Sequence, residues 1–157
     1  MNQPKPSTHL RLATIGDARA IHELLVYYSS RGNLLPRTHE NICRHIRDFV
    51  VLEEAGKIIA SGALEVMSEN LGEIRSLVVA PDQQRRGLGQ QVAIELITLA
   101  KKIGLQRVMA LTYVPAFFTQ LEFLEVERDS LPEKIWLVCV KCYKFDRCDE
   151  IAVIRQL

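Results

Sequence analysis

Apolar and polar residues recur along the chain with two periods, and these predict an alternation of strands and helices. Apolar residues spaced three and four apart predict an amphipathic helix over residues 15–30, and a second apolar stripe predicts another over 88–104. Two runs rich in valine and isoleucine, 48–53 and 57–66, flank a short glycine-containing loop and predict a hairpin. The other expected elements are a strand at 9–13, a short helix after Thr38, strands at 72–79 and 107–112, a short helix at 115–121, and strands at 124–127 and 134–140.

The composition fits a single domain over residues 1–157. Of the 157 residues, 48% are hydrophobic and 25% are charged, which is enough apolar material for a sizeable core. The order of the expected elements predicts an α/β fold, an α+β mixed sheet with helices on both faces.

The charge balance argues against two classes of partner. Twenty basic and nineteen acidic residues leave a net charge of +1, which gives no general attraction to nucleic acid or to an anionic membrane. The first residues lack a signal-peptide pattern, and no run of apolar residues is long enough to span a membrane. We therefore expect a cytoplasmic protein with no nucleic-acid or membrane partner; a homodimer stays possible.

The loop before the helix at 88–104 is the strongest chemical signal. It contains Gly87 and Gly89 beside two arginines, and it leads into a helix N-terminus, where free N–H groups and a partial positive charge suit a phosphate. A glycine pair alone is also consistent with an ordinary turn. A dinucleotide fingerprint would need a third glycine, and a P-loop would need a Gly-Lys-Ser or Gly-Lys-Thr sequence; the chain has neither.

The pattern Gln84-x-x-Gly87-x-Gly89, placed after a valine-rich strand, resembles the pyrophosphate-binding motif of the GNAT acetyltransferase superfamily. The resemblance covers the whole chain. It implies the GNAT fold with a splayed central sheet, and acetyl-CoA as co-substrate without a catalytic metal. It also implies that strand main-chain groups pair with pantetheine and loop amides bind the pyrophosphate. The implied acetyl-CoA contacts are Leu77, Val79, Gln84, Arg85, Arg86, Gly87, Leu88, Gly89 and Gln90.

Segments such as Gly32-x-Leu34-Leu35-Pro36-Arg37 narrow the resemblance to the short, single-domain N-acetylglutamate synthases. This implies acetyl transfer to the α-amine of L-glutamate or L-glutamine, at the first step of arginine biosynthesis. Arginine offers a bidentate fork for a carboxylate, so the resemblance implies that Arg37 holds one, assisted by main-chain groups near Ser76. An exposed loop arginine is otherwise usually a solvated charge. Arg75 and Lys134 are further candidates for the second carboxylate.

A substrate ammonium must lose a proton before it attacks the thioester, and Glu73 is the candidate base. It lies fourteen residues before Gly87, the spacing at which histone-modifying members of the superfamily place their base. Strand alternation would put Glu73 on one face with Arg75, Leu77 and Val79. The alternative is an ordinary carboxylate at a strand end.

The usual general acid of the superfamily, a tyrosine before a Gly-Phe pair, has no counterpart here. Phe118 occupies its position, and the pair has become Glu122-Phe123. Water, the released ammonium or Tyr113 remain as proton sources for the thiolate. Direct attack would pass through a tetrahedral intermediate, whose oxyanion a strand N–H would stabilise.

Three cysteines near the C-terminus raise the question of a metal. Cys139, Cys142 and Cys148 have partial zinc-knuckle spacing, but a fourth ligand is not evident, and buried cysteines also pack as small hydrophobes. The four histidines show no paired ligand spacing and are interpreted as surface or packing residues. No metal site is assigned. Two alternatives stay open: a transferase for another amine or a protein N-terminus, and a non-catalytic acyl-CoA sensor.

Overall fold

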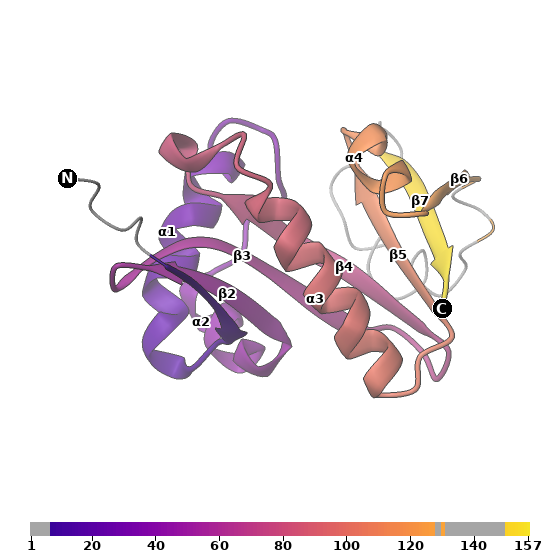
Figure 1. The fold of residues 1–157 in the computed structure, drawn as a ribbon, viewed down its shortest axis with the longest axis horizontal. Helices are drawn as coiled ribbons and strands as arrows, with labels where there is room; N and C mark the ends of the chain where they lie inside the picture. Colours follow the sequence, from indigo (N-terminus) through magenta and orange to yellow (C-terminus); the bar gives the residue numbers. More distant parts are fainter. Residues whose placement is uncertain (1–6, 128–129, 131–149) are drawn as a thin grey trace. The chain divides into compact units, whose positions relative to one another are not determined.

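The computed structural model describes residues 7–127, 130 and 150–157 (Figure 1). Its strands follow the order β1-β2-β3-β4-β5-β7-β6 and include parallel and antiparallel pairs, which confirms the predicted mixed α/β class. Within the described ranges no helix is long and apolar enough to cross a membrane. The main elements are β1 (Thr8–Leu12), α1 (Ala18–Ser29), α2 (His39–Arg44), β2 (Phe49–Glu54), β3 (Lys57–Val66), β4 (Leu71–Val79), α3 (Leu88–Lys102), β5 (Arg107–Thr112), α4 (Pro115–Thr119), β6 (Leu124–Val126) and β7 (Ile151–Gln156).

The chain forms two compact units. The first contains Met1–Ala63 and Ser76–Leu96, and the second contains Leu64–Arg75 and Ile97–Leu157. Both β4 and α3 therefore contribute residues to each unit. That the whole chain is one domain stays a prediction.

In the first unit, β1, β2 and β3 pair as an antiparallel meander. The predicted hairpin between β2 and β3 is confirmed, and Glu54 pairs with Lys57 across its turn. Ala55 and Gly56, the two turn residues, have φ angles of 51° and 77°. Positive φ at both positions is the type I′ pattern, whose twist matches that of the flanking strands. The turn thus sets the register of the pairs beside it, and the register then shifts once between Leu52 and Glu53.

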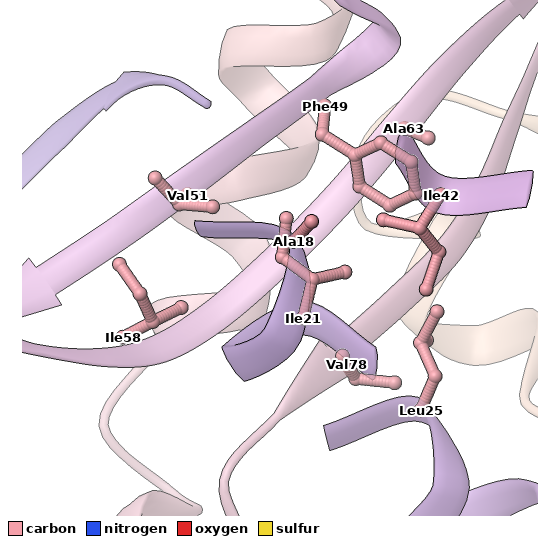
Figure 2. Close-up of a cluster of buried hydrophobic side chains, with 9 residues drawn as sticks. All are labelled: Ala18, Ile21, Leu25, Ile42, Phe49, Val51, Ile58, Ala63 and Val78. Carbon is pink, nitrogen blue, oxygen red and sulfur yellow. The ribbon is translucent and has the colours of Figure 1, made fainter. Parts of the chain in front are cut away.

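The core of the first unit lies between these strands and the helices α1 and α2, as Figure 2 shows. The apolar stripe expected over 15–30 supplies Ile21 and Leu25, while α2 supplies Ile42. Phe49 is fully buried at the start of β2. Burial of one such side chain stabilises the folded state by about 1.5–3 kcal/mol. The nine buried residues of this cluster are Ala18, Ile21, Leu25, Ile42, Phe49, Val51, Ile58, Ala63 and Val78.

In the second unit, β5 pairs antiparallel with β7, and β7 pairs antiparallel with β6 (Figure 1). The strand Ile151–Gln156 was not predicted from the sequence. It places Ala152 in a small buried cluster with Met67, Leu71 and Met109. The strand predicted at 134–140 lies outside the described residues.

The pairing and the backbone conformation of the strand β4 change along its length. Its parallel ladder with β5 runs from Leu71 opposite Arg107 to Glu73 opposite Met109, while β4 itself continues to Val79. Ser76 has a φ of 54°, in the left-handed region. Side chains alternate between faces only while the backbone stays extended, and such a residue acts like a bulge. The expectation that alternation would place Glu73 on one face with Leu77 and Val79 is therefore wrong.

Candidate active site

The glycine loop joins β4 to α3 in the predicted strand–loop–helix order. After a 3-10 turn at Pro81–Gln83, Arg85 and Gly87 have φ angles of 66° and 74°. Turns of this kind expose main-chain N–H groups to an anion, and the N-terminus of α3 adds a partial positive charge. A Cβ built on Gly87 would meet no protein atom within 4 Å, so the space beside this residue is open. The loop is therefore suited to bind a phosphate group.

The residues around this loop differ in their burial. Leu88 is 4% exposed and anchors the first turn of α3 in the core, while Gly89 is half-buried and Gln90 is exposed. Leu77 packs its side chain beside Gly62, where a Cβ would lie only 3.0 Å from the Leu77 Cδ1 atom. A strand residue can pack in this way while its main-chain groups remain ligand contacts.

The side chain of Gln84 turns back onto the strand. Its Nε2 donates to the carbonyl oxygen of Val79 at 3.1 Å and to Tyr28 Oη at 2.7 Å. Tyr28 Oη in turn donates to the same carbonyl at 2.5 Å. Burial raises the pKa of Tyr28, and the hydrogen bond from Gln84 partly opposes this. The sequence predicted Tyr28 only as part of an apolar helix stripe. Its hydroxyl, which needs a hydrogen-bond partner when it is buried, was the one feature that indicated a further role.

Arg86 is held by the β2–β3 hairpin. Its Nη2 lies 2.7 Å from Glu54 Oε2, its Nη1 lies 3.3 Å from Glu54 Oε1, and it also donates to Gln83 Oε1. The hydrogen bond with Glu54 raises the pKa of Arg86. Arg85, the other arginine of the loop, is exposed.

Arg37 donates hydrogen bonds to two neutral side chains. Its Nε donates to Asn41 Oδ1 at 2.8 Å, its Nη1 donates to Ser76 Oγ at 3.2 Å, and its Cζ lies 5.0 Å from the centre of the Phe49 ring. The Thr38 hydroxyl accepts from the main-chain N–H of Asn41 and so caps α2. The structure thus brings Arg37 and Ser76 together, through the serine side chain.

Glu73 lies in a second charged cluster. It is 3% exposed, and its Oε1 lies 3.4 Å from Arg75 Nε. Arg75 Nη1 also lies 2.5 Å from Glu65 Oε2. The guanidinium of Arg75 thus contacts two protein carboxylates.

The position of the missing tyrosine is a packed aromatic site. Phe118 is 5% exposed, and its ring meets those of Phe117 and Phe123 edge-on at 5.0 and 5.2 Å. Glu122 has a φ of 67°, and Phe123 N donates to Phe118 O at 3.1 Å. This is a Schellman helix end, which usually has glycine where Glu122 stands. Tyr113 is partly exposed, with 39% of its surface accessible.

The remaining candidate ligands show no cluster in the part of the chain that the structure describes. The rings of His22 and His39 pack edge-on at 6.0 Å, and His45 Nδ1 lies 3.4 Å from Asp48 Oδ2. Among these described residues, no group of three His, Cys, Asp or Glu side chains could hold a metal ion. The other predicted residues, Lys134, Cys139, Cys142 and Cys148, lie outside the described ranges.

Known proteins resemble this chain over most of its length. Residues 19–123 match the Acetyltransferase (GNAT) family. An uncharacterized N-acetyltransferase of Chlorobaculum tepidum is 35% identical over 98% of this chain and 99% of its own length. The amino-acid acetyltransferase of Mycobacterium tuberculosis is 33% identical over 81% of this chain and 74% of its own length.

A solved structure shows the same fold. The N-acetylglutamate synthase of Neisseria gonorrhoeae, complexed with coenzyme A and N-acetyl-glutamate, matches 98% of this chain with a TM-score of 0.86 and 30% identity. This chain spans only 36% of that synthase and 29% of the amino-acid acetyltransferase of Neisseria meningitidis. The predicted GNAT fold is therefore confirmed. The chain belongs to the GNAT acetyltransferase family and is an acetyl-CoA-dependent N-acetyltransferase.

Proposed function

We propose that this enzyme moves the acetyl group of acetyl-CoA to the α-amine of L-glutamate or L-glutamine, the first step of arginine biosynthesis. The observation that carries the proposal is the setting of Arg37. Its guanidinium donates to Asn41 Oδ1 and to Ser76 Oγ, and these two hydrogen bonds fix the direction of the side chain. A guanidinium held in this way can present its fork to a substrate carboxylate.

The names of the relatives support the same substrate class. The relative from Mycobacterium tuberculosis is named amino-acid acetyltransferase, and the solved synthase from Neisseria gonorrhoeae holds N-acetyl-glutamate beside coenzyme A. Lys134 is our candidate for a second carboxylate of the substrate. Arg75 is a weaker candidate for that role, because Glu65 and Glu73 already contact its guanidinium.

For acetyl-CoA, we place pantetheine along the main chain of β4 and the pyrophosphate at the loop that opens α3. Main-chain N–H groups of Leu77 and Val79 would pair with the pantetheine arm, and those of residues 85–90 would bind the pyrophosphate. The positive φ angles of Arg85 and Gly87 and the open space beside Gly87 support this placement.

Glu73 is our candidate base. It would take a proton from the substrate ammonium, directly or through a water, and the free amine would attack the thioester carbon. The C–N bond forms in a tetrahedral intermediate, whose oxyanion accepts a hydrogen bond from an N–H of the Leu77 to Val79 strand. The C–S bond then breaks, and the proton that the acetylated nitrogen loses passes through water to the thiolate of coenzyme A. Phe118 has no proton to give.

A thiol-release assay with acetyl-CoA against the standard amino acids tests the substrate. We expect turnover with glutamate or glutamine and much less with lysine or with a polyamine such as spermidine. Arg37→Ala provides the matched control, because it should lose the preference for the acidic amino acid while still binding acetyl-CoA. A wild-type preference for spermidine would reject the amino-acid substrate and would favour a general amine transferase.

A further inference from the structure

The carbonyl of Val79, at the end of β4, is held by two side chains. Tyr28 Oη donates to this oxygen at 2.5 Å, and Gln84 Nε2 donates to it at 3.1 Å. Gln84 Nε2 also donates to Tyr28 Oη at 2.7 Å, which closes a triangle of hydrogen bonds. A carbonyl oxygen accepts two hydrogen bonds, so the acceptor capacity of Val79 is filled.

The strand itself offers this carbonyl no partner on the side of β3. The next residue, Ala80, donates its N–H to the carbonyl of Ile59 in β3 at 2.8 Å. Successive residues of a strand direct their main-chain groups to opposite edges, so those of Val79 face away from β3. A carbonyl at such an edge needs a donor from elsewhere, and Tyr28 and Gln84 provide two.

The same triangle ties the loop to the strand. Gln84 follows the 3-10 turn, and Gln83 N donates to Ala80 O at 2.9 Å. The bond from the Gln84 side chain to Val79 fixes the first residue of the loop relative to the strand that the loop leaves. Farther along, Arg86 donates through Nη1 and Nη2 to the two carboxylate oxygens of Glu54. The loop is therefore attached at two points, first through the triangle and then through this ion pair.

We propose that Tyr28 and Gln84 are positioning residues for acetyl-CoA. This rests on the proposed placement of the cofactor along β4 and the loop. By filling the carbonyl of Val79, the two side chains leave its N–H as the group that this strand end offers to the pantetheine arm. They also hold the loop so that its N–H groups meet the pyrophosphate together. Gln84 thus acts through Val79 and Tyr28, without touching the cofactor by its side chain.

Calorimetric titration of coenzyme A into the full chain tests the proposal. Tyr28→Phe keeps the ring and removes the hydroxyl, and we expect the dissociation constant to rise about fivefold to tenfold, the value of one hydrogen bond. The matched control is Tyr27→Phe. The Tyr27 ring packs on Tyr28 at 5.0 Å and on the Arg31 guanidinium at 3.6 Å, and both contacts survive the change. This control should bind like the wild type.

Gln84→Ala provides a second variant at an exposed position, where the fold should tolerate it. It removes the Nε2 donor without adding a charge near the proposed pyrophosphate site, so it should weaken binding about as much as Tyr28→Phe. The double variant Tyr28→Phe/Gln84→Ala should lose less than the product of its two single losses, since both serve one network. In kinetics, the KM for acetyl-CoA should rise while kcat and the KM for the amino acid stay near their wild-type values.

Two results would separate this proposal from the function on which it rests. If the wild type binds coenzyme A and both Tyr28→Phe and Gln84→Ala bind it equally well, the two residues are merely structural, even if the melting temperatures of the variants fall. If the wild type itself does not bind coenzyme A, the proposed cofactor site is wrong and the positioning role fails with it.

Discussion

Two arginines, one in each compact unit, differ in the contacts that they make. Arg37 donates to the uncharged oxygens of Asn41 and Ser76, while Arg75 contacts the carboxylates of Glu65 and Glu73. Hydrogen bonds to neutral groups fix the direction of a guanidinium, and those to carboxylates also offset its charge. In the proposed function, Arg37 meets the substrate carboxylate and Arg75 supports Glu73.

Two other arginines of the molecule, Arg11 and Arg155, show which partners an arginine has elsewhere in this fold. Arg11 contacts Asp17 and Glu53 at 2.7 and 3.0 Å, in a cluster with no assigned role in the reaction. Arg155 lies 3.1 Å from Glu122, whose side chain is 80% exposed. Pairing with carboxylates is thus frequent among these side chains, and it does not by itself mark a functional site.

The largest expected effect is on the Arg75 side of the comparison. Glu73→Gln keeps the shape of the side chain and removes the base, so kcat should fall about a hundredfold or more. Stopped-time assays of thiol release across pH 6–9 would measure this, with coenzyme A affinity as the binding check. Glu65→Gln is the matched control, since it removes the other carboxylate of Arg75 and should change kcat far less. Equal losses in the two variants would mean that Glu73 has only a structural task.

The next effect concerns the Arg37 side. Arg37→Lys keeps one positive charge but loses the planar fork, so the KM for the amino acid should rise tenfold to a hundredfold with acetyl-CoA affinity unchanged. Asn41→Asp tests the comparison directly, because it replaces a neutral acceptor of Arg37 by a carboxylate like those beside Arg75. It should also raise this KM, by about tenfold. Wild-type constants in both variants would make Arg37 a solvated loop residue.

A smaller effect, on stability and not on activity, is expected for the ion pair of Arg11 with Asp17. Hydrogen bonds from Arg11 lower the pKa of Asp17, so this carboxylate stabilises the fold above its unfolded pKa of about 4, and the contribution is lost as pH falls through the lower folded value. Asp17→Asn should cost about 1 to 2 kcal/mol of unfolding free energy at pH 7. In urea titrations the gap to wild type should narrow below about pH 4. The KM values should stay unchanged, and a gap that persisted at pH 2 would contradict this account.

The smallest effect is expected where an arginine meets an exposed carboxylate. Glu122→Gly removes the ion pair with Arg155, which contributes little to stability because Glu122 is exposed to water. The change also removes the strain of a non-glycine residue with a left-handed backbone, roughly 1–2 kcal/mol. The greater freedom of glycine in the unfolded chain offsets part of this. We expect a net gain of about 0.5–1 kcal/mol, seen as a slightly higher melting temperature. A clear loss of stability would show that the Arg155 pair matters more than its exposure suggests.

The local sequence alone determined the bounds of several strands and the positions of two glycine turns. The bounds of β3 and β5 were predicted as observed, because β-branched runs and their flanking turns carry the information within a few residues. The Gly56 turn and the loop with Gly87 were likewise visible, since positive φ angles favour glycine. Family resemblance pointed to Arg37 and to main-chain groups near Ser76 as substrate contacts, and this stays a prediction; the hydrogen bond between the Arg37 and Ser76 side chains was not foreseen.

Tertiary structure decided the rest, since it depends on contacts between distant residues. The strand β7 is stabilised by its pairing with β5 and β6. A short apolar run in the sequence does not predict such pairing. The left-handed Ser76 lies inside a strand that reads as continuous, and it broke the alternation expected for Glu73. Tyr28 looked like one more apolar residue until the fold brought its hydroxyl to the Val79 carbonyl. Period and turn chemistry act over neighbouring residues, whereas the partner of a buried polar atom is chosen only when the chain closes on itself.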